Sequence, residues 1–97
     1  MRIIAKRTLR EFWEVHPDSE QALKSWHFIA AGAVWSTPQD VKNHFAKASI
    51  IGDNRVVFDI CGGSYRLIVK FNYSYGIGYV RFIGTHAEYD KIDAEGI

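Results

Sequence analysis

The strongest constraint on the fold is a change in hydrophobic spacing near residue 48 of this 97-residue chain. Before residue 46, large apolar residues recur three or four positions apart, which is the spacing of amphipathic helices. From residue 48 onward they alternate with polar residues, as in strands that bury one face. We therefore expect the helices to precede the sheet, in an α+β fold.

The first half of the chain contains two predicted helices with local start and stop signals. Residues 1–5 predict a short strand, at the edge of the sheet or second from it. A helix is expected over 6–15, where a nearby proline stops it. Asp18 or Ser19 can cap a second helix that ends near Gly32. The predicted buried residues are Leu9, Phe12 and Trp13 in the first helix, and Ala22, Leu23, Trp26, Ile29 and Ala30 in the second.

A third, shorter helix is predicted from the tetrapeptide Thr37-Pro38-Gln39-Asp40. It combines a capping hydroxyl, a proline at the first helical position and an acid in the first turn. One or two turns should follow, through Val41 and Phe45.

The remaining chain predicts an antiparallel sheet of about four strands. The expected strands are 49–51, 55–60, 65–72 and 77–84, with glycine-containing turns between the first three and a loop at 73–76. Thr85 can cap a short final helix over 88–94.

The strand 65–72 indicates which face of the sheet is free for chemistry. Its odd-numbered residues are all apolar or aromatic and should face the helices, which leaves Arg66 and Lys70 on the open face. A four-residue loop would set Arg66 opposite Ile83 and Ile68 opposite Arg81, so that Arg81 joins the open face. These cations are either phosphate ligands or ordinary solvated strand residues.

Residues 75–82, YGIGYVRF, nearly match the RNP1 signature of the RNA-recognition motif. Tyr75 stands where the signature has a basic residue, however, and Ile77 where it has an aromatic one. Only fifteen residues follow Phe82, whereas the missing helix, strand and loops need about 25. The chain is therefore not expected to form an RNA-recognition motif.

Charge and cysteine content exclude several protein classes. Twelve basic and eleven acidic side chains give a net charge of +1, which does not by itself indicate a nucleic-acid-binding protein. Four scattered histidines and the lone Cys61 lack metal-ligand spacing, so neither a metal nor a cofactor is expected. Without a signal peptide or a membrane span, the chain is expected to be a soluble cytoplasmic protein that makes no membrane contact.

The second half of the chain resembles a known family. VVFDICGGS followed by YRLIVKFNYSYGIGYVRFIGTHAEYDKID is similar to the C-terminal half of the HigB toxins of the RelE superfamily. Trp26, Trp35, the Thr-Pro-x-Asp cap and Phe45 extend the resemblance upstream. It covers nearly the whole chain, so we expect residues 1–97 to form a single toxin domain with a RelE-like fold.

The resemblance implies a ribosome-dependent mRNA endonuclease that a cognate HigA-type antitoxin neutralises. DNA contact is expected only through the toxin–antitoxin complex. Expected catalytic residues are Arg66, Arg81, His86 and Tyr89, and expected RNA contacts are Lys70, Lys91 and Arg7. The RNA's own 2′-OH would attack the adjacent phosphate without a metal, and His86 or Tyr89 would act as base or acid. The alternative is a non-catalytic RNA-binding or partner-binding domain that uses the same cationic face.

Overall fold

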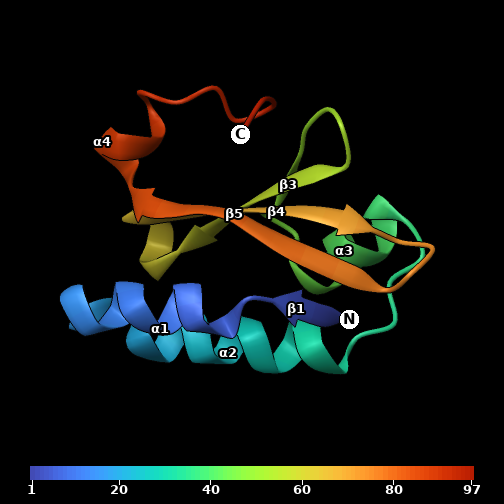
Figure 1. Cartoon of the computed structure of the whole chain (residues 1–97), viewed down its shortest axis with the longest axis horizontal. Helices are drawn as coiled ribbons and strands as arrows, with labels where there is room; N and C mark the ends of the chain where they lie inside the picture. Colours follow the sequence, from blue (N-terminus) through green and yellow to red (C-terminus); the bar gives the residue numbers. More distant parts are fainter.

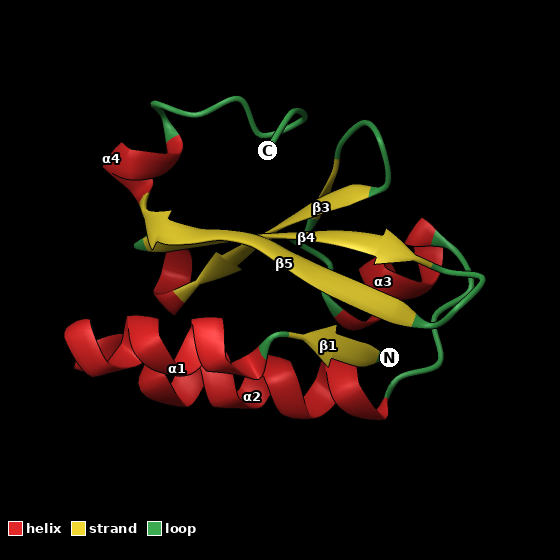
Figure 2. Cartoon of the chain, viewed as in Figure 1, coloured by secondary structure: helices red, strands yellow, loops and turns green.

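The computed structural model describes all 97 residues as a five-stranded sheet with four α-helices (Figures 1 and 2). In chain order the elements are β1 (Arg2–Ile4), α1 (Lys6–Val15), the 3₁₀ turn η1 (Pro17–Ser19), α2 (Glu20–Gly32), α3 (Pro38–His44), β2 (Ser49–Ile50), β3 (Arg55–Ile60), the 3₁₀ turn η2 (Cys61–Gly63), β4 (Tyr65–Asn72), β5 (Ile77–Thr85) and α4 (His86–Tyr89). None of the helices has the length and apolar character needed to cross a membrane.

The strand order is β1-β5-β4-β3-β2. The last four strands pair antiparallel, and β1 lies parallel to β5 at the edge of the sheet. The predicted α+β fold is confirmed. The N-terminal strand makes the sheet five-stranded and mixed, where about four antiparallel strands were expected.

Helices α1 and α2 cover one face of the sheet, and α4 with the C-terminal end lies over the other (Figure 1). Leu9 and Trp13 of α1 are buried against this core, as predicted. In α2, Leu23, Trp26 and Ala30 are buried, but the prediction for Ile29 is wrong because its side chain is 38% exposed. Ile29 lies at the edge of the apolar stripe, beside the exposed Phe28.

Two threonines begin helices as the sequence predicts. Thr37 accepts a hydrogen bond from the amide of Asp40, and Thr85 accepts one from the amide of Glu88. The carboxylate of each acid in turn accepts a hydrogen bond from the amide of its threonine. The bond from the Thr85 amide is the main cause that holds the pKa of Glu88 below its ordinary value. Losing such a cap costs about 1 kcal/mol.

The final helix is shorter than predicted and begins earlier, because Thr85 fixes its start at His86. It ends at Tyr89, so the predicted helix over 88–94 is wrong. The amide of Glu95 donates to the carboxylate of Asp93, and the amides of residues 96 and 97 donate to its main-chain carbonyl. These turn hydrogen bonds pair the backbone amides that a longer helix would otherwise have paired.

The register of β4 with β5 is as predicted only for half of the hairpin. Asn72 pairs with Ile77 and Val69 with Val80, but Ile68 pairs with Phe82. Arg81 is the extra residue of a β-bulge and has no partner on β4. The predicted pairs Arg66–Ile83 and Ile68–Arg81 are therefore wrong. A β-bulge changes the direction of a side chain on one strand, while the two strands remain paired before and after it.

The hydroxyl of Tyr65 on β4 donates to Asp18 in η1 at 2.7 Å. This bond, helped by burial, raises the pKa of Tyr65 to about 12. Because the protonated phenol is favoured only in the fold, its stabilising effect should disappear as pH rises from about 10 toward 12.

We predict that two of the five tyrosines, Tyr65 and Tyr73, titrate late in ultraviolet absorbance, and that the step of Tyr65 lies near pH 12. Replacing Asp18 by Asn should move that step toward the ordinary tyrosine pKa of about 10. Tyr75→Phe removes an exposed tyrosine and should leave the late step unchanged. Titration of every tyrosine together near pH 10 would contradict the assignment.

Candidate functional site

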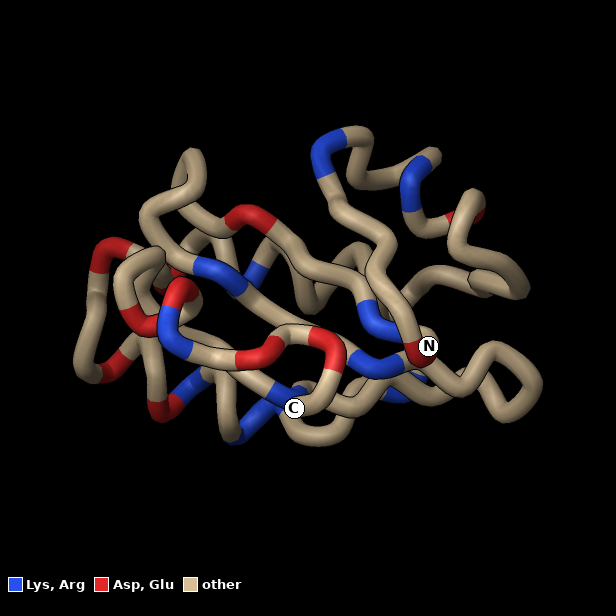
Figure 3. The backbone as a smooth tube through the Cα atoms, turned by 90° about the horizontal axis from the view of Figure 1, so that it is seen from above, with Lys and Arg blue, Asp and Glu red and all other residues tan.

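The face of the sheet opposite α1 and α2 carries charged residues from β3, β4 and β5. Arg66 and Lys70 lie on this face, as the alternation of β4 predicts. On β3, Asp59 pairs with Arg66 and Arg55 pairs with Lys70. Acidic and basic positions are interspersed on this side of the molecule and form no single basic patch (Figure 3). Each cation must therefore be judged from its own contacts.

Arg66 lies at the end of the face next to α4. Its Nε is 3.3 Å from Asp59, and its Nη1 donates to the carbonyl of Gly63. The guanidinium also lies over the ring of Tyr89, with 5.8 Å between its central carbon and the ring centroid. These contacts hold the side chain at 17% exposure and leave Nη2 without a protein partner. That nitrogen is available to an anion.

His86 and Tyr89 belong to the single turn of α4, and His86 pairs with Asp90. The His86 Nδ1 is 3.1 Å from a carboxylate oxygen of Asp90, and both side chains are more than half exposed. When the carboxylate accepts from Nδ1, the other ring nitrogen has no protein partner and can form a hydrogen bond with a ligand. The structure thus brings Arg66, Tyr89 and His86 to the same end of the sheet.

Lys70 and Arg81 lie farther along the face, where they line an open cleft of about 600 Å³. Lys70 is four residues from Arg66, about 13 Å along the strand. The aromatic ring of Tyr79 and the amides of Asn54 and Asn72 also line this cleft. The one protein partner of Arg81 is a main-chain oxygen of Ile97, the last residue of the sequence, at 3.4 Å.

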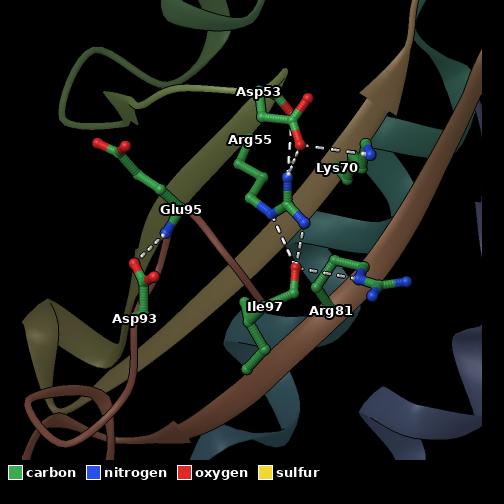
Figure 4. Close-up of polar contacts among 7 residues, drawn as sticks. All are labelled: Asp53, Arg55, Lys70, Arg81, Asp93, Glu95 and Ile97. Atoms are coloured by element: carbon green, nitrogen blue, oxygen red, sulfur yellow. Dashed lines mark hydrogen bonds and ion pairs between the residues drawn. The ribbon is translucent and has the colours of Figure 1, made fainter.

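Arg55 lies opposite Lys70 on the neighbouring strand β3 and is 5% exposed. Its Nη1 donates to Asp53, and its other nitrogens donate to the carbonyl of Ile97 (Figure 4). Asp53 also lies 3.6 Å from Lys70. The bond from Arg55 is the main cause that holds the pKa of Asp53 below its ordinary value, and the charge of Lys70 adds to it.

The seven predicted site residues fall into four locations. Arg66, His86 and Tyr89 form one cluster, and Lys70 and Arg81 form a second on the same face. Lys91 follows α4 and is exposed. Arg7 lies on α1, across the sheet from both clusters, and pairs with Glu11 at 3.4 Å. The structure does not bring Arg7 together with the other candidates.

Sequence reasoning missed Arg55 and the three carboxylates that pair with the candidates, Asp53, Asp59 and Asp90. Two signals were available for them. Asp90 follows His86 by four positions, which places the two on one helical face. Asp59 and Arg55 share the alternation of β3, so pairing β3 with β4 would set them beside Arg66 and Lys70.

No group of three or more histidine, cysteine, aspartate or glutamate side chains is placed to hold a metal ion. The chemistry offered by the face comes from guanidinium and ammonium donors, one imidazole and the phenols of Tyr79 and Tyr89. Arginine forks bind phosphate oxygens, and an imidazole beside a carboxylate can move protons near neutral pH. The arrangement suits a phosphodiester.

Two comparisons with known proteins give the same family. The model of the HigB toxin family, described as a RelE-like toxic component of a toxin–antitoxin system, matches residues 19–92. The chain is 29% identical over 94 residues to a protein of Escherichia coli O6:H1 named "mRNA interferase HigB", covering 95% of this chain and 91% of that protein. The matched residues include all the candidates except Arg7.

We predict that the two arginines differ in their effect on stability. Arg81→Ala removes an exposed side chain whose one hydrogen bond is long, and should change the free energy of unfolding by less than about 0.5 kcal/mol. Arg66→Ala removes the ion pair with Asp59 and the hydrogen bond to the carbonyl of Gly63 and should cost about 1 kcal/mol, because water can reach the exposed Asp59 carboxylate. Urea unfolding of both variants measures the difference. Equal losses would show that Arg66 is not fixed by these contacts.

Proposed function

Because this chain belongs to the HigB family of RelE-like toxins, we propose that it is a ribosome-dependent mRNA endonuclease that inhibits translation. The chain is the toxin of a toxin–antitoxin system, and its relative is named an mRNA interferase. The observation that carries the mechanism is the cluster of Arg66, Tyr89 and His86 at one end of the sheet. Residues 1–97 act as one toxin domain in the cytoplasm.

The reaction is an attack by the RNA's 2′ oxygen on the adjacent phosphorus. The new O2′–P bond forms as the P–O5′ bond breaks, which leaves a 2′,3′-cyclic phosphate and a 5′-hydroxyl. A base accepts the 2′ proton, and an acid supplies a proton to the leaving 5′ oxygen. DNA lacks the 2′-hydroxyl and is not a substrate for this step.

The residues of the first cluster take distinct parts in this reaction. His86, oriented by Asp90, exchanges a proton with the RNA through its other ring nitrogen. The free Nη2 of Arg66 donates to the charged phosphorane. Tyr89 serves as the second proton-transfer group or stacks on a base.

The second cluster holds the RNA on either side of the reacting phosphate. Arg81, expected with Arg66 among the catalytic residues, lies with Lys70 in the cleft. Its exposed guanidinium suits a neighbouring phosphate. Lys91 provides a further exposed cation near α4. An RNA strand that crosses the face from the cleft to α4 would meet all of these groups.

The partners follow from the family. A cognate HigA-type antitoxin binds the toxin and neutralises it, and the toxin meets DNA only within that complex. Messenger RNA is cut while it is bound to the ribosome, which presents the strand to the cationic face.

The cellular test is to induce the chain alone in bacteria and map mRNA 5′ ends. We expect growth arrest with new ends inside translated frames, and rescue by coexpressed antitoxin. His86→Ala should lower the cleavage rate by about 10²–10⁴-fold because it removes a proton-transfer group. Lys24→Ala, on the opposite face, is the matched control. Normal growth with intact messages would support a non-catalytic binding domain instead.

The dependence on the ribosome and on the 2′-hydroxyl is tested with purified components. The chain should cut a message on translating ribosomes and leave the same message intact when it is free in solution. A single 2′-deoxy substitution at the cut nucleotide should abolish cleavage. Cleavage of the deoxy-substituted message would rule out the 2′-OH mechanism.

A further inference from the structure

The open cleft on the cationic face contains an aromatic ring and a side-chain amide that the proposed cleavage does not use. Both belong to the β4–β5 hairpin, where Tyr79 pairs with Lys70 and Asn72 pairs with Ile77. Residues opposite each other on paired strands point to the same face, and so do residues two apart on one strand. Tyr79 and Asn72 are therefore diagonal neighbours on the face of Lys70. Diagonal neighbours lie about 7–8 Å apart, a distance that a base stacked on the ring can span.

The side-chain amide of Asn72 is fixed in one orientation. Its Oδ1 accepts a hydrogen bond from the backbone amide of Tyr75 at 3.1 Å, in the loop that joins the two strands. The N–H group of Tyr75 needs an acceptor, so the oxygen of the amide is the atom that faces the loop. The NH2 group of Asn72 has no protein partner. A ligand in the cleft therefore meets hydrogen-bond donors from this side chain.

Tyr79 provides an aromatic surface beside these donors. It is 37% exposed, whereas Phe58 and Phe71 of the same sheet are buried. Stacking of a base on an aromatic side chain is a general way in which proteins bind single strands. Lys70 and Arg81 line the same cleft, so the phosphates on either side of a stacked base have cationic partners. The combination of ring, amide and cations is that of a nucleotide site.

A donor in this position distinguishes the bases by their exocyclic group. Guanine and uracil carry an oxygen, which accepts a hydrogen bond, whereas adenine and cytosine carry an NH2 group, which donates one. Two donors that face each other both stay unpaired, and this lowers the affinity. Of the two bases with an oxygen, guanine has the larger ring system to stack on Tyr79.

We propose that the cleft is a subsite for a guanine base of the message. The ring of Tyr79 stacks on the base, and the NH2 group of Asn72 donates to its O6 oxygen. The inference deepens the proposed function, on which it rests, because it assigns a base preference to the same RNA-binding face. The cleft lies about 13 Å along the strand from Arg66, so the guanine is a neighbour of the nucleotide that is cut.

The test measures binding of the full chain to short oligodeoxynucleotides that carry one test base between abasic positions. These probes lack the 2′-hydroxyl and are not cut, and low ionic strength preserves their phosphate contacts. The guanine probe should bind about 2–10-fold more tightly than the adenine probe, which corresponds to one hydrogen bond. A probe with 2-aminopurine, which has a purine ring but no O6 oxygen, should bind as the adenine probe does.

Asn72→Asp separates recognition of the base from the structure of the loop. The carboxylate keeps an oxygen that accepts from the Tyr75 amide, but it replaces the NH2 donor with an acceptor. The variant should therefore bind the adenine probe more tightly than the guanine probe. Its added negative charge weakens the binding of both probes and cancels in their ratio.

Asn43→Asp is the matched control. The Oδ1 of Asn43 likewise accepts a hydrogen bond, from Gln39, and the residue lies on α3, on the other side of the sheet (Figure 1). This substitution should leave the ratio of the two affinities unchanged. Tyr79→Ala removes the stacking surface and should weaken the binding of every probe by about 5–100-fold, with the preference for guanine retained.

The position of the bound base is read by NMR, in which the guanine probe should shift the side-chain NH2 signal of Asn72. Equal affinity of the wild type for the guanine and adenine probes would overturn the inference. So would an unchanged preference in Asn72→Asp, or a wild type that binds no probe. None of these results bears on the proposed function, which is decided by the mapped 5′ ends.

Discussion

The pairing of β4 with both of its neighbours is the interaction on which the rest of the structure depends. It buries the odd-numbered residues of β4 against α1, α2 and α3. Because side chains alternate along a strand, Arg66 and Lys70 then lie on the other face. The same pairing sets Asp59 beside Arg66 and Arg55 beside Lys70. The core and the candidate site are therefore two faces of one ladder, and a shift of register would destroy both.

Much of the fold could be predicted because its signals are local. The spacing of Leu9 and Trp13 gave the first helix, and the Thr-Pro-x-Asp tetrapeptide gave the start of α3. The alternation of β4 gave the face of Arg66 and Lys70. Each of these features depends on residues within a few positions of one another, so no tertiary information is needed to find them.

The errors lie where distant parts of the chain meet. The bulge at Arg81 adds one residue to β5, and no local pattern fixes where a ladder will absorb it. Arg55 looked like an ordinary polar position of β3 because the group that buries it, the carbonyl of Ile97, lies 42 residues away. Asp59 was missed for the same reason, since it meets Arg66 only through pairing of the strands. Asp90 is the exception, because its spacing of four residues from His86 is a local signal.

The acidic partners explain how the proposed RNA-cleaving face is compatible with a net charge of +1. Asp59 pairs with Arg66, Asp53 pairs with Lys70 and Arg55, and Asp90 pairs with His86. Each carboxylate fixes the position of its partner and also offsets positive charge on the face. A face with few uncommitted cations gains little from counterion release and binds free RNA weakly. The proposed dependence on the ribosome then has a physical reason. The ribosome supplies the local concentration and orientation of the strand, and the toxin needs only the few donors that act at the reacting phosphate.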